Sequence, residues 1–427
     1  MPLGQGEDEL VAVESLHGGN DTIPIFEQGG ATLAQQIPEI QSALAEAGLD
    51  GWFFACFQQN DPLGMSLLGL TGEGKLVSRR CYYLVPREGE PRKLVHAIES
   101  GMLDHLPGEK TVYNTWQGHG EGVAKLVSGF PRLAAQYSPN NELPTVSRLD
   151  AGTFELLRAA GVEVVSSADL AQQFVATWSP EQLAGHRRAN VHLHRIALEA
   201  FQRVAESLRR GDEIDEYAVQ RFIMDAFEIA GLWAESDPIV GVNAHSADPH
   251  YQPGPGHSSP IRQGDFLLID LWAKEKQADS VYADITWVGV CAASPTPRQQ
   301  EVFSVVAGAR DAAWDLVNSR FPRQTVRGFE VDDAAREVIR KAGYGDLFIH
   351  RTGHSIGITD HGQGANMDNL ETHDTRALLP MTGFSIEPGV YIVGDFGVRS
   401  EINVALTPEG AEITGAEPQR ELLRLLA

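Results

Sequence analysis

Four carboxylates lie in segments whose neighbouring residues are typical of buried strands. Asp270 ends the apolar run in FLLID, and Asp284 lies inside VYADITW. Glu387 and Glu401 lie in FSIEPG and VRSEINV. A lone buried carboxylate loses its hydration, so it stays protonated or pairs with a cation. Arg399 is the only basic residue within two positions of any of the four, so local sequence offers them little neutralisation.

Divalent cations would resolve this excess of buried negative charge, because shared metal ions stabilise clustered carboxylates that otherwise repel. Any single acid of this kind is more often a turn cap or the partner of an arginine. The four together favour a metal site. His354, between glycines in HRTGHSIG, is the candidate nitrogen ligand, although a lone histidine in such a segment is more often structural. Oxygen ligands with one imidazole suit Mn(II), Co(II), Fe(II) or Zn(II).

Composition places the chain in the globular class and excludes several partners. The 427 residues are enough for two or three domains. With 34 basic and 58 acidic residues the net charge is −24, which disfavours nucleic acid and anionic membrane surfaces. The three cysteines lack metal-binding spacing, and the start of the sequence lacks the basic and apolar regions of a signal peptide. These features predict a cytoplasmic protein without membrane insertion.

Helix-start signals divide the chain into regions. Ser179, Pro180 and Gln182 form a capping-box pattern before an apolar stripe that ends at Gly211, and Thr296 to Gln299 repeats that pattern. The segments FLLIDLWA, VYADITWVGV, FSIEPGVYIV and VRSEINVALT are each expected to form strands. We expect an N-terminal extension at residues 1–30, whose role stays open, an α/β domain at 31–177 and a second domain at 178–427.

The acidic and histidine motifs carry a specific resemblance. Read in order, IDLWA, ADITW, HRTGHSIG, SIEPGVY and GVRSEI resemble the ligand motifs of the pita-bread metallopeptidases, the family of prolidase, aminopeptidase P and creatinase-like proteins. The resemblance implies an α/β (α+β) chain, with a pita-bread catalytic domain at 178–427 and a creatinase/prolidase-type domain before it. It also implies two divalent metal ions, with manganese expected and cobalt, zinc or iron as alternatives. The implied metal ligands are Asp270, Asp284, His354, Glu387 and Glu401.

The resemblance also assigns roles around the metals. Glu387 is implied as the catalytic group that relays a proton to the leaving nitrogen. His250 and His361 look like the family's catalytic, substrate-side histidines, with His245 as a weaker competitor for the first position. Arg399 is expected to steady a ligand carboxylate or to bind a substrate carboxylate.

The implied activity is hydrolysis of Xaa-Pro peptide bonds by a metal-bridging hydroxide, as a dipeptidase or an aminopeptidase acting on proline-containing di- or oligopeptides. A homodimer is expected from the same resemblance. Two departures from the family pattern bear on the substrate. Asp270 and Asp284 are fourteen residues apart, which predicts a longer turn, and His361 is followed by Gly362 where many relatives carry an acid. A creatinase-like amidase or lyase, and a non-catalytic binding module, therefore remain alternatives.

Overall fold

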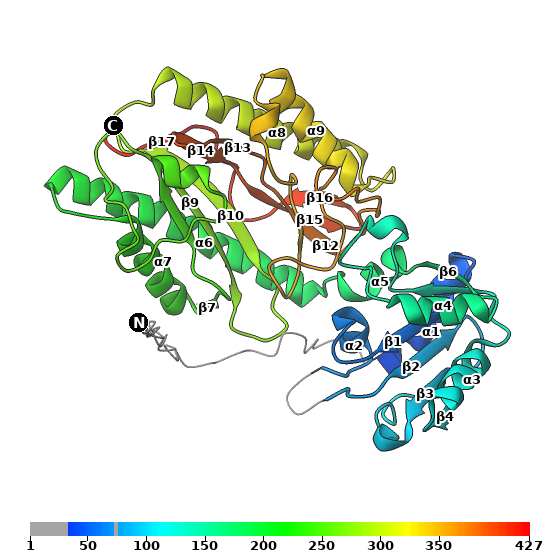
Figure 1. The fold of residues 1–427 in the computed structure, drawn as a ribbon. Coiled ribbons are helices and arrows are strands. Elements are labelled where there is room, and N and C mark those ends of the chain that lie inside the picture. Colours follow the sequence, from blue (N-terminus) through cyan, green and yellow to red (C-terminus); the bar gives the residue numbers. More distant parts are fainter. Residues whose placement is uncertain (1–32, 72–75) are drawn as a thin grey trace, which may run out of the picture.

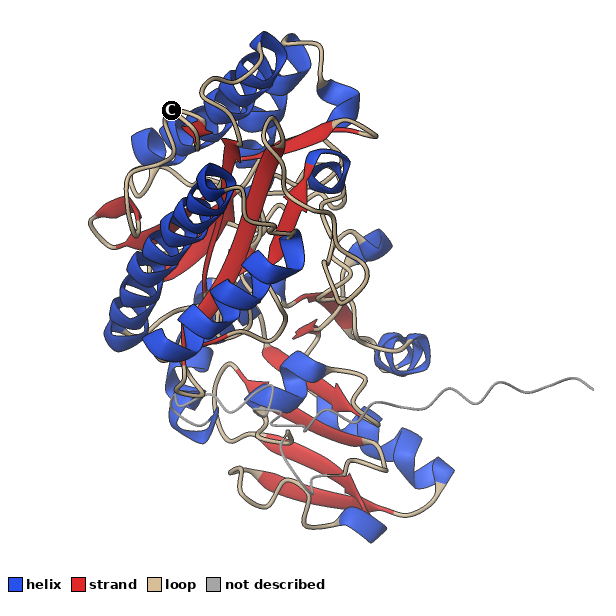
Figure 2. Cartoon of the chain, turned by 90° about the vertical axis from the view of Figure 1, so that its left-hand side faces the viewer, coloured by secondary structure: helices blue, strands red, loops and turns tan. Residues whose placement is uncertain are grey.

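The computed structural model describes residues 33–71 and 76–427, so the extension predicted at 1–30 lies outside the described residues. Two groups of strands lie at opposite ends of the molecule (Figure 1), and the side view in Figure 2 separates them in the same way. The first group contains residues before Val175, and the second contains residues after Pro180. Helices and strands alternate or pack together in both groups, so the predicted α/β class is confirmed.

The first group is one mixed, six-stranded sheet in the order β4-β3-β2-β1-β5-β6. Its central strands are uniformly apolar because helices cover both faces, and two separate hydrophobic clusters lie against them. Its strands are β1 (Gly51–Cys56), β2 (Cys81–Pro86), β3 (Arg92–His96), β4 (Glu109–Tyr113), β5 (Arg132–Ala135) and β6 (Glu163–Ser166). Its helices are α1 (Leu33–Glu46), α2 (Pro62–Leu67), α3 (Trp116–Val127), α4 (Ala151–Ala159) and α5 (Ala168–Val175).

The second group is built around a long antiparallel hairpin of β9 (Phe266–Glu275) and β10 (Ala283–Val290). This hairpin pairs with β7 (Leu232–Trp233), β8 (Ile239–Val242) and β17 (Leu423–Arg424). A four-stranded sheet follows in the order β11-β12-β15-β16, and β13 pairs with β14. These strands are β11 (Ser355–Ile356), β12 (Thr382–Ile386), β13 (Gly389–Ile392), β14 (Phe396–Arg399), β15 (Ile402–Thr407) and β16 (Gly410–Ile413).

Four helices cover the two sides of these strands. Those on the hairpin side are α6 (Pro180–Arg210) and α7 (Glu216–Ala230), and those on the other side are α8 (Pro297–Arg320) and α9 (Gly328–Lys341) (Figure 1). Apolar side chains fill both interfaces as two clusters. The strands that carry the predicted ligands are therefore held between two helical layers and kept rigid.

The predicted helix starts are confirmed. Ser179 and Thr296 both make complete capping boxes, and α6 ends at Gly211 in the left-handed conformation. Just before α6, the Trp178 backbone N–H donates to Met381 O at 2.6 Å and its indole N–H donates to Ile356 O at 3.2 Å. The indole ring occupies the space where a side chain on Gly383 would lie.

Two of the expected strands are each two strands, which corrects the sequence prediction. FSIEPGVYIV divides into β12 and β13 at Glu387–Pro388, and VRSEINVALT divides into β14 and β15 at Ser400–Glu401. The chain changes sheets at both places, because β12 pairs with β15 while β13 pairs with β14. The two glutamates therefore lie at strand breaks, where their side chains can leave the regular alternation of a sheet.

Every helix within the described ranges is too short or too polar to cross a lipid bilayer.

Candidate metal centre

The hairpin register places two of the predicted ligands on one face. Asp270 lies opposite Thr286, and Trp272 lies opposite Asp284. Because side chains alternate with a period of two, these four residues share a face and the two carboxylates are diagonal neighbours. Both carboxylates are buried, with 6% and 5% of the residue exposed. The seven residues 276–282 form the turn that joins the two strands. The length of this turn does not change the pairing that brings the two carboxylates together.

His354 directly precedes β11 and is oriented by β12. Its backbone N–H donates to Ser385 Oγ at 3.0 Å, and its Nδ1 lies 3.1 Å from the carbonyl of the next residue. Its Nε2 therefore faces the acids, 3.5 Å from Asp284 Oδ2 and 3.4 Å from Glu387 Oε1. A side chain at Gly353 would collide with the carbonyl oxygen of Ser385, which explains the glycine before the histidine.

The strand breaks deliver the two glutamates to the same place. The Glu401 backbone N–H donates to Thr286 O at 3.3 Å, and the Glu387 backbone N–H donates to Thr352 O at 2.7 Å. Ligand atoms of Glu401, Asp284 and His354 all lie within 4.8 Å of one another. The hydroxyl of Thr286 joins Asp270 to this group, because it lies 3.0 Å from Asp270 Oδ1 and 2.9 Å from Glu401 Oε2. All five predicted ligands are thus neighbours.

The electrostatics of this cluster fit a binding site for divalent cations. Burial, followed by repulsion from nearby carboxylates, raises the pKa of Asp284 and Glu401 well above the usual range. Burial also raises the pKa of Asp270, despite the opposing charge of Arg399. Within the described part of the chain, Asp284 Oδ1 and Glu401 Oε1 are buried oxygens without a hydrogen-bond partner. Unpaired buried oxygens facing one imidazole are what divalent metal ions require as ligands, so the residues fit the implied metals.

Glu387 differs from the other three acids. Burial would raise the pKa of its carboxyl group, but the nearby His354 and Arg399 hold that pKa below its usual range. Its Oε1 accepts a hydrogen bond from Ser385 Oγ at 3.0 Å, and its side chain keeps 13% of its surface exposed. Glu387 is therefore the carboxylate of the cluster that is most readily ionised and most accessible to a ligand.

Arg399 contacts the predicted ligands directly. Its guanidinium forms an ion pair with Asp270, donates to Thr286 Oγ1 at 2.9 Å and lies 3.8 Å from Glu387 Oε2. Its remaining nitrogen lies 3.4 Å from Tyr391 Oη, and its side chain is 6% exposed. These contacts engage all three guanidinium nitrogens, which favours the expectation that Arg399 steadies a ligand carboxylate over binding a substrate.

Four of the five predicted ligands, Asp270, Asp284, His354 and Glu387, line a cavity of about 840 Å³. Both predicted substrate-side histidines, His250 and His361, are exposed and line it. The ring of His361 lies 4.3 Å from that of His354, between centroids. His245 is directed elsewhere, with its Nδ1 2.9 Å from the buried carboxylate of Glu216. The cavity is large enough for a short peptide.

A family comparison agrees with this geometry. A model of metallopeptidase family M24 matches residues 191–408, which is slightly more than half of the chain. The chain belongs to metallopeptidase family M24. The matched range includes all five predicted ligands and both cavity histidines. As an M24 member the protein is a metallopeptidase that uses divalent metal ions, so the alternative of a non-catalytic binding module is wrong.

Similar proteins of this family include dipeptidases. A Mycobacterium tuberculosis protein named probable dipeptidase PepE is 29% identical over 384 residues, covering 88% of this chain and 93% of that protein. The Xaa-Pro dipeptidase of Pyrococcus furiosus is 35% identical over 187 residues, covering 44% of this chain and 49% of that protein.

Solved structures establish the pita-bread fold of this M24 chain. Dipeptidase PepE from Mycobacterium ulcerans matches with a TM-score of 0.65 and 24% identity, covering 92% of this chain and 98% of that chain. The prolidase of Thermococcus sibiricus matches with a TM-score of 0.59 and 23% identity, covering 93% of this chain and all of that chain. The predicted fold family is confirmed.

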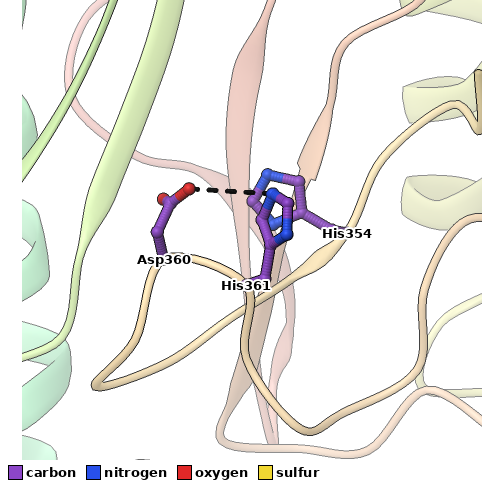
Figure 3. A group of neighbouring side chains, drawn as sticks. All are labelled: His354, Asp360 and His361. Atoms are coloured by element: carbon purple, nitrogen blue, oxygen red, sulfur yellow. Dashed lines mark ion pairs between the residues drawn. The ribbon is translucent and has the colours of Figure 1, made fainter. Parts of the chain in front are cut away.

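Sequence reasoning missed several residues of this M24 cavity. Asp360 and the rings of His354 and His361 face one another in Figure 3, and their ligand atoms lie within 4.8 Å. Asp360 Oδ1 is buried without a hydrogen-bond partner among the described residues, and burial raises the pKa of this carboxyl group well above the usual range. The only sequence feature that could have indicated Asp360 is its position directly before His361.

A second missed group lies behind Arg399. The Nε2 of His350 lies 2.8 Å from Tyr391 Oη, which is also in contact with Arg399. Desolvation inside the site lowers the pKa of His350 to about 4, so this imidazole is neutral at pH 7. A neutral histidine can form a hydrogen bond with the tyrosine without adding charge to the cavity.

Proposed function

We propose that this protein is a dinuclear-metal peptidase that cleaves the bond before proline in Xaa-Pro dipeptides or at the start of longer peptides. The observation that carries the proposal is the convergence of four carboxylates and one imidazole, with buried unpaired oxygens, beside a peptide-sized cavity. The choice of proline is supported by the relatives named Xaa-Pro dipeptidase.

Five residues would hold the two ions, which when bound supply Lewis acidity and activate water for attack on the peptide carbonyl. Manganese is our proposed metal, with cobalt, zinc and iron as alternatives, because the donor set is oxygen with one nitrogen. Asp270, Asp284, His354, Glu387 and Glu401 would share the coordination of the two ions between them.

The remaining roles belong to side chains that face the cavity. Glu387 accepts a proton from the attacking water at its carboxylate and passes it to the leaving nitrogen, because it is ionised and reachable. His361 and His250 hold the substrate and donate to the oxygen of the tetrahedral state. In the metal-free protein, repulsion from His354 followed by burial lowers the pKa of His361.

The test is a metal-resolved activity screen of the full-length protein. We expect close to two equivalents of bound metal by elemental analysis after manganese loading, and hydrolysis of proline dipeptides or of Xaa-Pro-Xaa tripeptides. His354→Ala should lower kcat/KM by about 100-fold or more and reduce the metal content. His373→Ala is the control, because His373 is exposed and lies outside the cavity lining. A loaded protein that leaves a broad panel of these peptides intact contradicts the proline assignment.

The same screen separates the remaining alternative. Turnover of a small non-peptide amide, abolished by His354→Ala and unaccompanied by peptide cleavage, would instead assign the creatinase-like amidase or lyase activity. The homodimer and the cytoplasmic location belong to the proposal as well. Light scattering of the purified protein tests whether it is a homodimer.

A further inference from the structure

The side chains that line the cavity are mostly acidic, and only one of its two arginines is firmly bound by other protein groups. Seven carboxylates and two arginines are among the residues that line it. Arg399 is fully engaged by Asp270, Thr286 and Tyr391. Arg351 is the second arginine, and it lies three residues before His354. Away from the proposed metal ions, Arg351 is therefore the lining cation best able to attract an anionic group of a ligand.

Arg351 is held loosely by the protein itself. Its Nη1 lies 3.9 Å from Glu371 Oε2, and Glu371 is 45% exposed, so this ion pair is weak. The backbone N–H of Arg351 donates to the other oxygen of the same carboxylate at 3.1 Å, which fixes the main chain and leaves the side chain free. Among the described residues, no hydrogen bond engages its guanidinium, and 22% of its side chain is exposed.

We propose that Arg351 binds the free terminal carboxylate of a short peptide and thereby selects di- and tripeptides over longer or C-terminally blocked substrates. This inference rests on the proposed peptidase function and deepens it. A guanidinium matches a carboxylate with two parallel hydrogen bonds, which lysine cannot make. The residue is a specificity determinant, because it contacts the far end of the substrate and not the reacting carbonyl.

The geometry of a short peptide supports this role. Arg351 lines the same cavity as the predicted ligands Asp270, Asp284, His354 and Glu387, so a peptide cleaved at the metal site would lie in the cavity that Arg351 lines. The cavity of about 840 Å³ encloses only a few residues, so the terminal carboxylate of a dipeptide or tripeptide stays inside it. A carboxylate held away from the ions in this acidic, partly desolvated cavity is stabilised by a cationic side chain.

The experiment compares free-acid and amide forms of the same peptide. Alanyl-proline and alanyl-prolinamide, with the matching tripeptide pair, are assayed with manganese-loaded, full-length enzyme. We expect the wild type to prefer the acid by roughly 10- to 100-fold in kcat/KM, which is the value of one charge-assisted bidentate contact. In Arg351→Met this preference should fall to about threefold or less, mainly through a higher KM for the acid, while the amide changes little.

Two further variants make the result specific. Arg351→Lys should restore part of the acid preference, because it returns the charge without the fork geometry. Arg87→Met is the matched control, since Arg87 makes a similarly loose 3.7 Å ion pair with Asp50 in the other sheet region. Metal content is measured for each protein, so that loss of the ions is separated from loss of carboxylate binding.

The outcomes are distinguishable. An acid preference that survives Arg351→Met, in a protein that keeps its metal and cleaves the amide, overturns the inference and leaves the proposed function standing. A wild type that cleaves acid and amide equally well also overturns it. A loaded wild type that cleaves no peptide of either form overturns the proposed function itself.

Discussion

At the scale of single residues, the cluster depends on a hydroxyl of the ADITW motif, on a residue that is neither an acid nor a histidine. Thr286 is fully buried, and its Oγ1 contacts Asp270, Glu401 and Arg399 at once. One hydroxyl can donate a single proton, so it accepts from the guanidinium and donates to one of the two carboxylates. Through this contact the two strand systems that carry the acids are fixed relative to each other.

Thr286→Val should weaken metal binding by about 10- to 100-fold, because it keeps the shape of the side chain and removes the hydroxyl that orients two ligands. Isothermal titration of the metal-free protein with Mn(II) measures the effect. Thr286→Ser keeps the hydroxyl and should retain most of the affinity. Equal affinities for the valine and serine variants would show that the hydroxyl does not organise the site.

At the scale of elements, β11 and β12 set the direction of the imidazole. The pairing of Ser355 with Phe384 brings the main chain at Gly353 against the carbonyl of Ser385, where only a hydrogen atom fits. The same approach brings the backbone N–H of His354 to the hydroxyl of Ser385. The glycine is therefore needed for a strand contact, and the direction of the histidine ring follows from that contact.

Gly353→Ala should lower both the melting temperature and the metal content, because the methyl group forces β11 away from β12. We expect a destabilisation of roughly 1–3 kcal/mol, as for other overpacked sites. Calorimetry with and without manganese measures it. Gly308→Ala in α8 is the control, since its methyl group would meet ordinary contacts and should be neutral or slightly stabilising. An unchanged metal content in Gly353→Ala would contradict this explanation.

The elements also show what the sequence could predict. Helix starts depend on residues three positions apart, so Ser179 and Thr296 marked α6 and α8 correctly. The acids of the hairpin were found because they interrupt apolar runs. The sheet changes at Glu387 and Glu401 were missed, since they depend on which distant strands pair. Thr286 was missed for the same reason, because its partners Glu401 and Arg399 are far away in the chain. Asp360 was missed although His354 and His361 are close to it in the sequence, because its burial arises only in the folded cavity.

At the scale of the whole molecule, the long helix α6 contributes buried histidines that the reaction does not use. His186 is enclosed, with Nδ1 2.6 Å from Tyr282 O and Nε2 2.8 Å from Thr414 Oγ1. His194 is packed edge-on against Trp287. Burial lowers the pKa of each to about 4. Both rings therefore join the helix to the strands as neutral groups. The proposed division at residue 178, immediately before this helix, stays a prediction.

These two histidines predict loss of stability in acid. The unfolded chain binds protons at the ordinary histidine pKa of about 6.5, while the folded chain binds them only near 4. Stability from this source is complete above about pH 6.5 and is lost as pH falls toward 4, by on the order of 3 kcal/mol for each histidine. Urea unfolding of the metal-free protein across this range measures the slope.

His194→Leu removes one titrating group, so its free energy of unfolding should fall less steeply between pH 6.5 and 5 than that of the wild type. The carboxylates of the metal site contribute equally to both proteins and cancel in the difference. His373→Gln, at an exposed position, should keep the wild-type slope. Parallel slopes for wild type and His194→Leu would contradict the prediction.

The contact between Trp178 and Gly383 has an evolutionary consequence. The indole ring fills the space beside Gly383 and its N–H reaches Ile356, two residues after His354. A relative with any larger residue at position 383 would have to give up the tryptophan, and a relative that lost the tryptophan would tolerate alanine there. The two positions, more than 200 residues apart, should therefore covary among homologues. Such covariation would show that the segment before α6 packs against the sheet that orients the imidazole.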